Sequence, residues 1–462
     1  MLTSFVADQG AGAVALRLAT AEDLALRLAA MEPAAAAWAD ATRFKAEPGK
    51  VLLVPNAAGG LGLVLVGMAR DDWLWAIAGL PGELPEGVYR LEGVSDARAA
   101  TLLALGWALG SYAFTRYKPA PRGFAKLVWP EGCSRRRVEA VAGGIRLARD
   151  LINTPAGDMG PAELAQAAEH LAVRHAASCR IILGDDLLRE NYPAIHAVGR
   201  GSARAPRLVD LVWGDERAAK LTLVGKGVCF DSGGLDLKPA SAMQLMKKDM
   251  GGAATLLGLA QAVMEANLPL RLRLLIPAVE NSVSGDAFRP MDVIRTRQGI
   301  TVEIGNTDAE GRLILCDALA EACAEKPDLV IDMATLTGAA RVALGPDLPA
   351  LFTNDDGLAA DLLRAGEEEG DALWRLPLWQ PYRDWLKSRV ADINNISDST
   401  FAGAITAALY LREFVAPGIA WVHIDTYAWN QKSRPGRPEG GEALALRALY
   451  ALIERRFAQA ET

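Results

Sequence analysis

Two hydrophobic periodicities alternate along the chain from about residue 150 onward. Short, nearly continuous apolar runs, as at Leu221–Phe230 and Leu329–Met333, predict strands that helices cover on both faces. Between such runs, apolar residues recur at every third or fourth position, as at Ala253–Ala266 and Leu313–Ala324, which predicts helices. This alternation predicts an α/β domain with a central, mostly parallel or mixed sheet flanked by helices. The further elements expected here are strands at Arg207–Trp213 and Leu270–Ile276 and helices at Ala162–His175, Ile405–Phe414 and Glu442–Phe457.

The part of the chain before about residue 130 carries shorter patterns of the same two kinds. Helical patterns at Thr20–Met31 and Ser95–Phe114 alternate with short β runs, which predicts a smaller α/β domain without a dense polar cluster. The β runs are Val51–Val54, Leu61–Val66, Leu74–Ile77 and Lys126–Trp129.

A basic amphipathic pattern at Ser134–Asp150 predicts a helix that connects the two parts. The length of 462 residues suits two or three domains. We therefore expect an N-terminal α/β domain over residues 1–133, a connecting helix over residues 134–150 and a larger α/β domain over residues 151–462.

Charge and cysteine usage indicate a cytoplasmic protein without general affinity for polyanions. The net charge is −7, so attraction to nucleic acid or to an anionic membrane is not expected. Arg135–Arg137 is a local basic patch, interpreted as the solvated start of the connecting helix. The five cysteines form no CxxC pair, as is typical of reduced structural thiols.

No membrane segment or secretory signal is expected. The uncharged stretch Val51–Ala69 is interrupted by Pro55 and Asn56 and is interpreted as two strands joined by a turn. Met1–Ala19 lacks a basic region and is interrupted by Asp8, so it is a poor secretory signal.

The most informative stretch of the chain is Asn306–Leu313, which sets Asp308, Glu310 and Arg312 at alternate positions before an apolar helical pattern. Charges this crowded at the start of a helix require a cation, and a metal ion is the obvious candidate. A regular helix would turn Asp308 and Glu310 about 200° apart. We therefore expect a turn through Ala309 rather than a regular helix start.

A second charged cluster follows the same pattern. Lys226 lies within an apolar strand pattern, Asp231 at its end, Lys238 shortly after it, and Asp249 before a Gly-Gly pair that opens a helix. In open α/β sheets, ligands bind beyond the carboxyl ends of the strands, where Asp231 and Asp308 are expected. Taken singly, Asp249 and Asp308 are better explained as helix N-caps, because aspartate is among the preferred capping residues. Taken together, the two clusters contain more charged residues than helix capping can explain.

The combined clusters suit a two-metal site. Four carboxylates balance two divalent cations, which together activate water and polarise a carbonyl or phosphoryl group. None of the four histidines lies in these motifs, so an HExxH zinc site is excluded. Oxygen ligands suit Mn²⁺ or Mg²⁺ as well as Zn²⁺. Lys226, Lys238 and Arg312 are all candidates to stabilise an oxyanion, and their charge alone does not rank them.

These motifs resemble the cytosolic leucine aminopeptidase family of two-zinc metallopeptidases. The resemblance lies in Val224–Pro239, Met246–Ala254 and Asn306–Leu313. It extends to Arg149–Pro155, Ile276–Asn281, Arg289–Pro290, Ala334–Ala339 and Gly403–Ala408.

The resemblance implies a role for each metal ligand. Asp231 and Glu310 are expected to bridge two metal ions, which are Zn²⁺ or Mn²⁺. Asp308 is expected to complete one site, partly through its backbone carbonyl, while Lys226 and Asp249 complete the other. Lys226 would have to be neutral, although a free lysine titrates near ~10.4.

The resemblance also implies the catalytic groups. Lys238 is expected to polarise the scissile carbonyl and Arg312 to hold a bicarbonate ion that acts as general base. The free α-amine of a peptide would bind one metal and Asp249, which makes the enzyme an exopeptidase. Met246, by itself, is equally typical of a core residue. The residues expected to form an apolar pocket for a leucine side chain are Met246, Thr335, Leu336, Gly338 and Ala339.

We therefore expect a cytoplasmic aminopeptidase that releases Leu and other apolar residues, assembled as a homohexamer, with residues 1–133 serving oligomerisation or regulation. Two alternatives are a DNA-binding or regulatory role of the same hexamer and a two-metal phosphoesterase. Leu235–Leu237 and His423–Asn430 depart from the commoner family pattern, which bears on side-chain preference rather than on chemistry.

Overall fold

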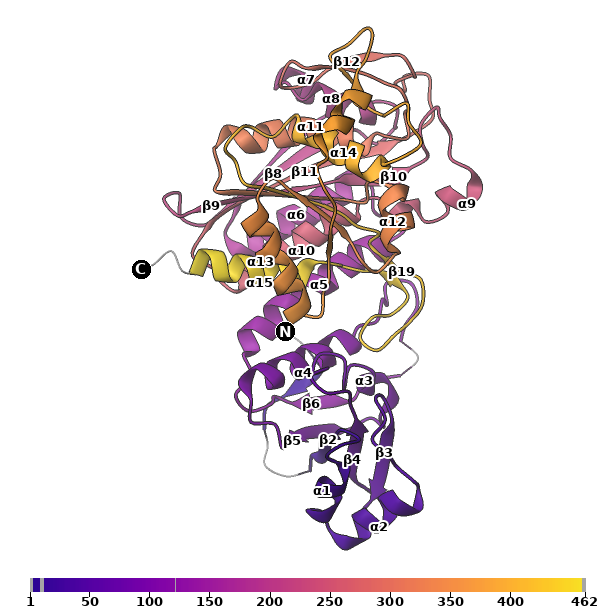
Figure 1. The fold of residues 1–462 in the computed structure, drawn as a ribbon, viewed down its shortest axis with the longest axis vertical. Helices are drawn as coiled ribbons and strands as arrows, with labels where there is room; N and C mark the ends of the chain where they lie inside the picture. The colour runs from indigo at the N-terminus through magenta and orange to yellow at the C-terminus, as the bar shows by residue number, and fades with distance from the viewer. Residues whose placement is uncertain (1–2, 9–11, 121, 459–462) are drawn as a thin grey trace. The chain divides into compact units, whose positions relative to one another are not determined.

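The computed structural model describes residues 3–8, 12–120 and 122–458 (Figure 1). It divides into two compact units, one of residues 1–143 with 432–439 and the other of residues 144–431 with 440–462. The boundary between the two units after residue 143 falls inside helix α5 (Arg135–Asn153). The segment Met1–Ala19, expected not to be a signal, is described only in part, because residues 1–2 and 9–11 lie outside the described ranges.

The first unit contains a six-stranded sheet with four helices among its described residues, as expected for a small α/β domain. The uncharged stretch from residue 51 forms an antiparallel pair of strands, which confirms the expected turn. The strands in sheet order are β1 (Phe5–Val6), β6 (Lys126–Val128), β5 (Val88–Glu92), β2 (Val14–Ala19), β4 (Leu61–Gly67) and β3 (Val51–Pro55). The helices are α1 (Leu24–Ala29), α2 (Pro33–Ala41), α3 (Leu80–Glu83) and α4 (Ala97–Gly110).

The prediction of a strand at Leu74–Ile77 is wrong. The backbone there forms successive turns that lead into α3, with the Ala76 amide donating to the Asp72 carbonyl and the Leu80 amide to the Ile77 carbonyl. Leu74 and Ile77 are both buried because their spacing places them on one side of these turns. A short apolar run did not distinguish this arrangement from a strand.

The second unit is built on a nine-stranded mixed sheet, as expected. Strands β18, β14, β9 and β11 are parallel neighbours, whereas β15, β8 and β7 join by antiparallel pairing. In sheet order the strands are β16 (Trp374–Arg375), β15 (Ala350–Thr353), β18 (Trp421–Asp425), β14 (Leu329–Ala334), β9 (Lys220–Gly225), β11 (Arg271–Asn281), β8 (Arg207–Trp213) and β7 (Ser178–Leu183), and β10 (Gly227–Asp231) pairs with β11.

The single strand expected at Leu221–Phe230 is divided in two. Lys226 separates β9 from β10, its amide donating to the Met333 carbonyl and its carbonyl accepting from the Ala253 amide. Because β10 no longer pairs with β14, the chain is free to turn Asp231 toward the site described below.

Helices cover both faces of this sheet (Figure 1). Helix α11 packs on one face beside α8 and α14, and α10 packs on the other beside α6 and α15. A Cβ on Gly258 of α10 would lie 2.3 Å from the Gly144 carbonyl oxygen of α5, so glycine permits this close packing. The helices are α6 (Pro161–His175), α7 (Asp186–Arg189), α8 (Pro193–Gly199), α9 (Ala240–Met243), α10 (Gly251–Glu265), α11 (Gly311–Ala324), α12 (Gly338–Leu344), α13 (Asp356–Glu368), α14 (Gly403–Arg412) and α15 (Leu446–Ala458), with 3-10 helices at Met246–Lys248 (η1) and Gln380–Leu386 (η2).

Two small sheets complete the second unit. One joins β12 (Val293–Arg295), β13 (Thr301–Glu303) and β17 (Ile393–Asn394), and the other joins β19 (Trp429–Asn430) and β20 (Gly440–Gly441). Within the described part of the chain, no helix has the length and apolar character that crossing a membrane requires.

Candidate metal centre

Asp231 lies where β10 ends, at the carboxyl edge of the large sheet. Its Oδ1 accepts hydrogen bonds from the Gly233 amide at 2.8 Å and from Asn281 Nδ2 at 2.9 Å. Asn281 Nδ2 also donates to the Thr307 carbonyl, 3.0 Å away. Asn281 therefore ties Asp231 to the segment that carries the next two carboxylates.

Asp308 and Glu310 precede helix α11, which begins at Gly311. The Ala309 amide donates to the Asn306 carbonyl at 3.3 Å, so the chain turns here as expected. Glu310 is the N-cap residue and makes no side-chain capping bond, so capping explains neither acid. Asp308 was expected at the end of a strand of the large sheet. The strand before this turn is instead β13, which belongs to the three-stranded sheet of β12, β13 and β17.

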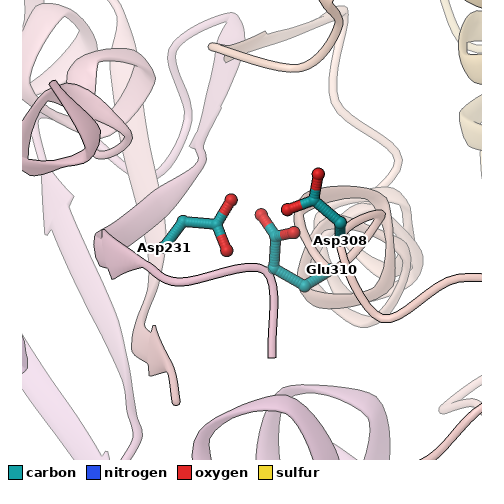
Figure 2. A group of neighbouring side chains, drawn as sticks. All are labelled: Asp231, Asp308 and Glu310. Carbon is teal, nitrogen blue, oxygen red and sulfur yellow. The ribbon is translucent and has the colours of Figure 1, made fainter. Parts of the chain in front are cut away.

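The turn brings three carboxylates together (Figure 2). Oxygen atoms of Asp231, Asp308 and Glu310 all lie within 4.8 Å of one another. Asp231 and Glu310 are almost completely buried, and Asp308 is half-buried.

Asn395, in the segment after β17, holds the turn in place, and no motif in the sequence indicated this role. Its Oδ1 accepts from the Gly305 amide at 2.8 Å, and its Nδ2 donates to the Asn306 carbonyl at 2.8 Å. Its own carbonyl accepts from an Arg312 guanidinium nitrogen, 2.7 Å away. The only trace in the sequence is the polar run around Asn394 and Asn395, which is typical of an ordinary loop.

Lys226 and Asp249 form a second, buried part of the site. Lys226 Nζ lies 2.7 Å from Asp249 Oδ2 and 3.0 Å from Glu310 Oε1, and it donates to the Thr335 carbonyl. Thr335 Oγ1 donates to Asp249 Oδ1 at 2.8 Å. The N-cap of α10 is Met250, so Asp249 does not cap that helix.

Lys238 contacts the carboxylate cluster from the other side. Its Nζ lies 2.8 Å from Asp231 Oδ2 and 2.5 Å from Asp308 Oδ1. The Lys238 side chain is partly exposed, in contrast to that of Lys226.

The carboxylates outnumber the cations that neutralise them. Burial and the neighbouring Asp231 raise the pKa of Glu310 to about 8 and that of Asp308 to about 6. Burial likewise raises the pKa of Asp249. Burial alone would lower the pKa of Lys226, but Asp249 and Glu310 outweigh it and raise that pKa. The cluster therefore favours added positive charge.

The donor atoms fit divalent metal ions. Glu310 Oε2 is buried and has no hydrogen-bond partner within the described part of the chain. Carboxylate oxygens are ligands that Mn²⁺ and Zn²⁺ both accept. An orphaned buried carboxylate oxygen is costly unless a ligand satisfies it.

Arg312 lies on the first turn of α11 and is buried. Its Nε has no hydrogen-bond partner in the described ranges, and burial lowers its pKa. A buried guanidinium nitrogen without a partner is suited to an anion.

A cavity of about 650 Å³ opens over these groups. All predicted site residues line it except Glu310, which is fully buried. The expected pocket residues on its wall are Met246, Thr335, Leu336, Gly338 and Ala339. The wall also contains Lys248, Arg341 and Tyr427, which the sequence analysis did not select.

The chain is similar to proteins of one family over almost its whole length. Residues 146–450 match the model of the cytosol aminopeptidase family, catalytic domain, and residues 14–130 match that of the M17 aminopeptidase, N-terminal domain. A probable cytosol aminopeptidase of Geobacter sp. (strain M21) is 42% identical over 375 residues, which cover 78% of this chain and 76% of the relative. Peptidase B of Enterobacter sp. (strain 638) is 40% identical over 435 residues, covering 91% and 97%.

Solved structures agree with this similarity. The crystal structure of a cytosol aminopeptidase from Coxiella burnetii shares 49% identity at a TM-score of 0.95, covering 98% of this chain and 99% of that one. The bottromycin maturation enzyme BotP in complex with Mn shares 36% identity at a TM-score of 0.87, covering 96% and 100%.

Proposed function

Because this chain belongs to the cytosol aminopeptidase family and is a metal-dependent aminopeptidase, we propose that its carboxylate cluster holds two divalent ions. Asp231 and Glu310 would bridge them, Asp308 would complete one site, and Lys226 with Asp249 would complete the other. The observation that carries this proposal is the buried Glu310 Oε2, which has no partner in the described ranges although its carboxylate lies among other acids. When bound, such a pair of ions supplies an activated water and polarises a carbonyl group.

Lys238 is proposed to stabilise the oxyanion that forms as the peptide bond is attacked. Lys238 lines the cavity and its side chain is partly exposed, so a substrate oxygen can approach it. Its contacts with Asp231 and Asp308 raise its pKa against the effect of burial, so it stays cationic at neutral pH. A fixed positive charge beside a developing oxyanion lowers the activation barrier.

Arg312 is proposed to hold bicarbonate, the general base that the site otherwise lacks. Two observations support this assignment. Arg312 lines the cavity, and its buried Nε has no partner among the described residues. The Asn395 carbonyl accepts from another nitrogen of the guanidinium and so holds the side chain in place.

Asp249 is proposed to bind the α-amine of the substrate, which restricts cleavage to the first peptide bond. Thr335 orients this carboxylate by donating to its Oδ1. The walls formed by Met246, Leu336 and Ala339 suit the side chain of a leading leucine or another apolar residue.

The assembly, the metal and the compartment are part of the same proposal. We propose a cytoplasmic homohexamer, with residues 1–133 serving oligomerisation or regulation. Manganese is supported by the similar BotP enzyme, whose structure is a complex with Mn, and zinc suits the same oxygen ligands.

Metal content and a substrate panel test this function together. The purified protein is expected to contain or take up two Mn²⁺ or Zn²⁺ per chain and to cleave leucine p-nitroanilide. N-acetyl-leucine p-nitroanilide should resist cleavage because it has no free α-amine for Asp249. Equal cleavage of both anilides, or a greater activity on p-nitrophenyl phosphate, would contradict the proposal.

A further inference from the structure

Asp236 and Thr307 join the two segments that carry Lys238 and Asp308. The Thr307 amide donates to Asp236 Oδ2 at 2.8 Å, and the Asp236 amide donates to Thr307 Oγ1 at 2.8 Å. Thr307 Oγ1 donates in turn to the Gly233 carbonyl at 2.6 Å and lies 3.2 Å from the same Asp236 oxygen. These contacts are called the Asp236–Thr307 link below.

Two glycines allow the segments to come this close. Gly233 and Gly234 have φ angles of +88° and +68°, a backbone conformation that favours glycine. A Cβ on Gly234 would lie only 3.0 Å from Thr307 Oγ1. The Lys238 amide closes the same turn by donating to the Ser232 carbonyl at 3.0 Å. The link therefore fixes the backbone from which the Lys238 side chain extends.

The link lies directly beside the ion pair of Lys238 and Asp308. Lys238 follows Asp236 by two residues, Asp308 follows Thr307 directly, and the Lys238 amine lies 2.5 Å from Asp308 Oδ1. The other acid at this amine is Asp231, and both acids are proposed to bind metal ions. The link contains no proposed metal ligand, so it holds the lysine segment independently of the metal. A lysine side chain has a flexible four-carbon stem, so a fixed backbone is needed to place its amine.

Exposure separates this positioning role from a role in folding. Thr307 is completely buried, whereas Asp236 is exposed. Loss of an exposed carboxylate leaves no hole in the core, so the fold should survive it. The neighbouring Leu235 and Leu237 are also exposed and do not line the cavity. The run Leu235–Leu237, which was expected to bear on side-chain preference, is thus tied to the site through Asp236.

Resting on the function proposed above, we infer that Asp236 is a positioning residue for Lys238. By holding Thr307, Asp236 keeps the Lys238 amine where the oxyanion forms. Asp236 itself contacts no reacting atom, and its effect on turnover passes through the lysine. Loss of the link should therefore lower kcat while KM changes little, because Lys238 acts on the transition state.

The test measures kcat and KM for leucine p-nitroanilide on the full-length, Mn²⁺-loaded enzyme. Asp236→Ala should lower kcat about 10-fold, less than the roughly 100-fold that a displacement of about 1 Å can cost, and KM should stay within about 3-fold. Asp236→Asn should retain most of the wild-type kcat, because its amide oxygen still accepts from the Thr307 amide. The content of bound Mn²⁺ should be unchanged in both variants.

Asp392→Ala is the matched control, because Asp392 makes the same kinds of contact with Thr301. Asp392 Oδ2 accepts from the Thr301 amide at 2.8 Å and from Thr301 Oγ1 at 2.7 Å, and the Asp392 amide donates to Thr301 Oγ1 at 3.0 Å. Asp392 is exposed as well, and neither residue lines the cavity. Asp392→Ala should therefore lower the Tm about as much as Asp236→Ala does, while its kcat stays unchanged.

The effect of Asp236→Ala should disappear when Lys238 has already been removed. Adding Asp236→Ala to Lys238→Ala should change kcat by less than about 2-fold, because two residues that act through one group are not additive. A further loss of about 10-fold in the double variant would show that Asp236 acts through other groups, and the inference would be wrong.

Other outcomes also overturn the inference. If the wild type cleaves leucine p-nitroanilide and Asp236→Ala has the same kcat, the inference fails while the proposed function stands. An equal loss of kcat in Asp392→Ala would assign the effect to general destabilisation. Loss of Mn²⁺ from Asp236→Ala would make Asp236 a support of the metal site instead of Lys238. No cleavage of leucine p-nitroanilide by the wild type would contradict the proposed function itself, and the inference with it.

Discussion

The amine of Lys226 lies 2.7 Å from a carboxylate oxygen of Asp249, and both side chains are almost completely buried. The contact joins the end of β9 to the segment before α10, and Glu310 approaches the same amine from the start of α11. One lysine thus compensates two buried carboxylates from separate parts of the chain.

Removal of the Lys226 charge should destabilise the metal-free protein. Lys226→Met leaves Asp249 and Glu310 without their shared cation, and breaking a buried ion pair from one side costs about 3–5 kcal/mol. Urea unfolding of the metal-free protein measures this loss. Lys220→Met is the control: Lys220 begins β9 and its amine donates to the Glu325 carbonyl at the end of α11, so the loss should be about 1 kcal/mol. Equal losses of unfolding free energy in the two variants would show that the buried ion pairs of Lys226 contribute no more to stability than the Lys220 hydrogen bond.

Glu310→Gln should weaken metal binding without a change of side-chain size. A metal ion at about 100 times its Kd stabilises a folded protein by about 2.7 kcal/mol. The rise in Tm on adding Mn²⁺ should therefore be clear in the wild type and much smaller in Glu310→Gln. Glu303→Gln provides a comparison, because Glu303 is a buried acid that contacts Ser388 outside the cluster. An unchanged rise in Glu310→Gln would remove Glu310 from the ligand set.

Lys238→Ala should reduce turnover and spare the metal ions. Loss of one oxyanion-stabilising group lowers kcat by roughly 10²–10³. Lys238 contacts Asp231 and Asp308 as a cation, so its removal should leave both acids free for metal. Steady-state kinetics on leucine p-nitroanilide and metal analysis check the two parts separately. A kcat near that of the wild type would assign Lys238 a structural role.

Gly311→Ala should impair catalysis through Lys226. A Cβ at Gly311 would lie 2.5 Å from Lys226 Cε and 2.8 Å from its Nζ, so the lysine must move. Alanine itself is favourable in a helix, so α11 should still form. Displacement of a group in the site by about 1 Å can cost roughly 100-fold in kcat/KM. Gly285→Ala, where a Cβ meets nothing within 4 Å, should leave kcat/KM unchanged.

The buried pair of His423 and Asp332 should make stability depend on pH. His423 Nδ1 lies 2.6 Å from Asp332 Oδ1. Burial alone lowers the pKa of His423, but the Asp332 carboxylate outweighs it and raises that pKa. Because the pKa of His423 is raised in the folded state, the charged pair stabilises the fold fully at pH values below the unfolded pKa of about 6.5. This stabilisation is lost as the pH rises through the folded-state pKa of His423.

Asp332→Asn removes this contribution. Its cost in free energy of unfolding, about 2 kcal/mol for a charge-assisted hydrogen bond, should be larger at about pH 6 than at about pH 9. Urea unfolding at both values measures the difference. Asp356→Asn, at an exposed acid that pairs with Arg375, should show no such difference. A cost that grows toward high pH would contradict the raised pKa of His423.

Local sequence patterns predicted most of the second unit because its strands are buried on both faces. Strands β8, β11 and β14 and helices α6, α10 and α11 occur where apolar periodicity placed them. The same reasoning failed at Leu74–Ile77, where a short apolar run forms turns rather than a strand. Periodicity reports which side of an element is buried, and four residues are too few to separate these structures.

The sequence by itself determined the family and the groups that we propose to carry the chemistry. The acids and lysines stand in motifs long enough to identify the family, and the spacing of Asp308 and Glu310 alone required a turn between them.

Only the tertiary structure decided which of these groups meet and what surrounds them. Asn395 positions the turn before Arg312, and the ring of Tyr427 contacts Lys248. Each of these contacts joins segments that lie far apart in the chain. Side-chain interactions fall off within a few ångströms, and no local pattern specifies which distant backbone will approach that closely. The carboxylate cluster could therefore be inferred from its residues, whereas the contacts that hold it in place depended on the fold.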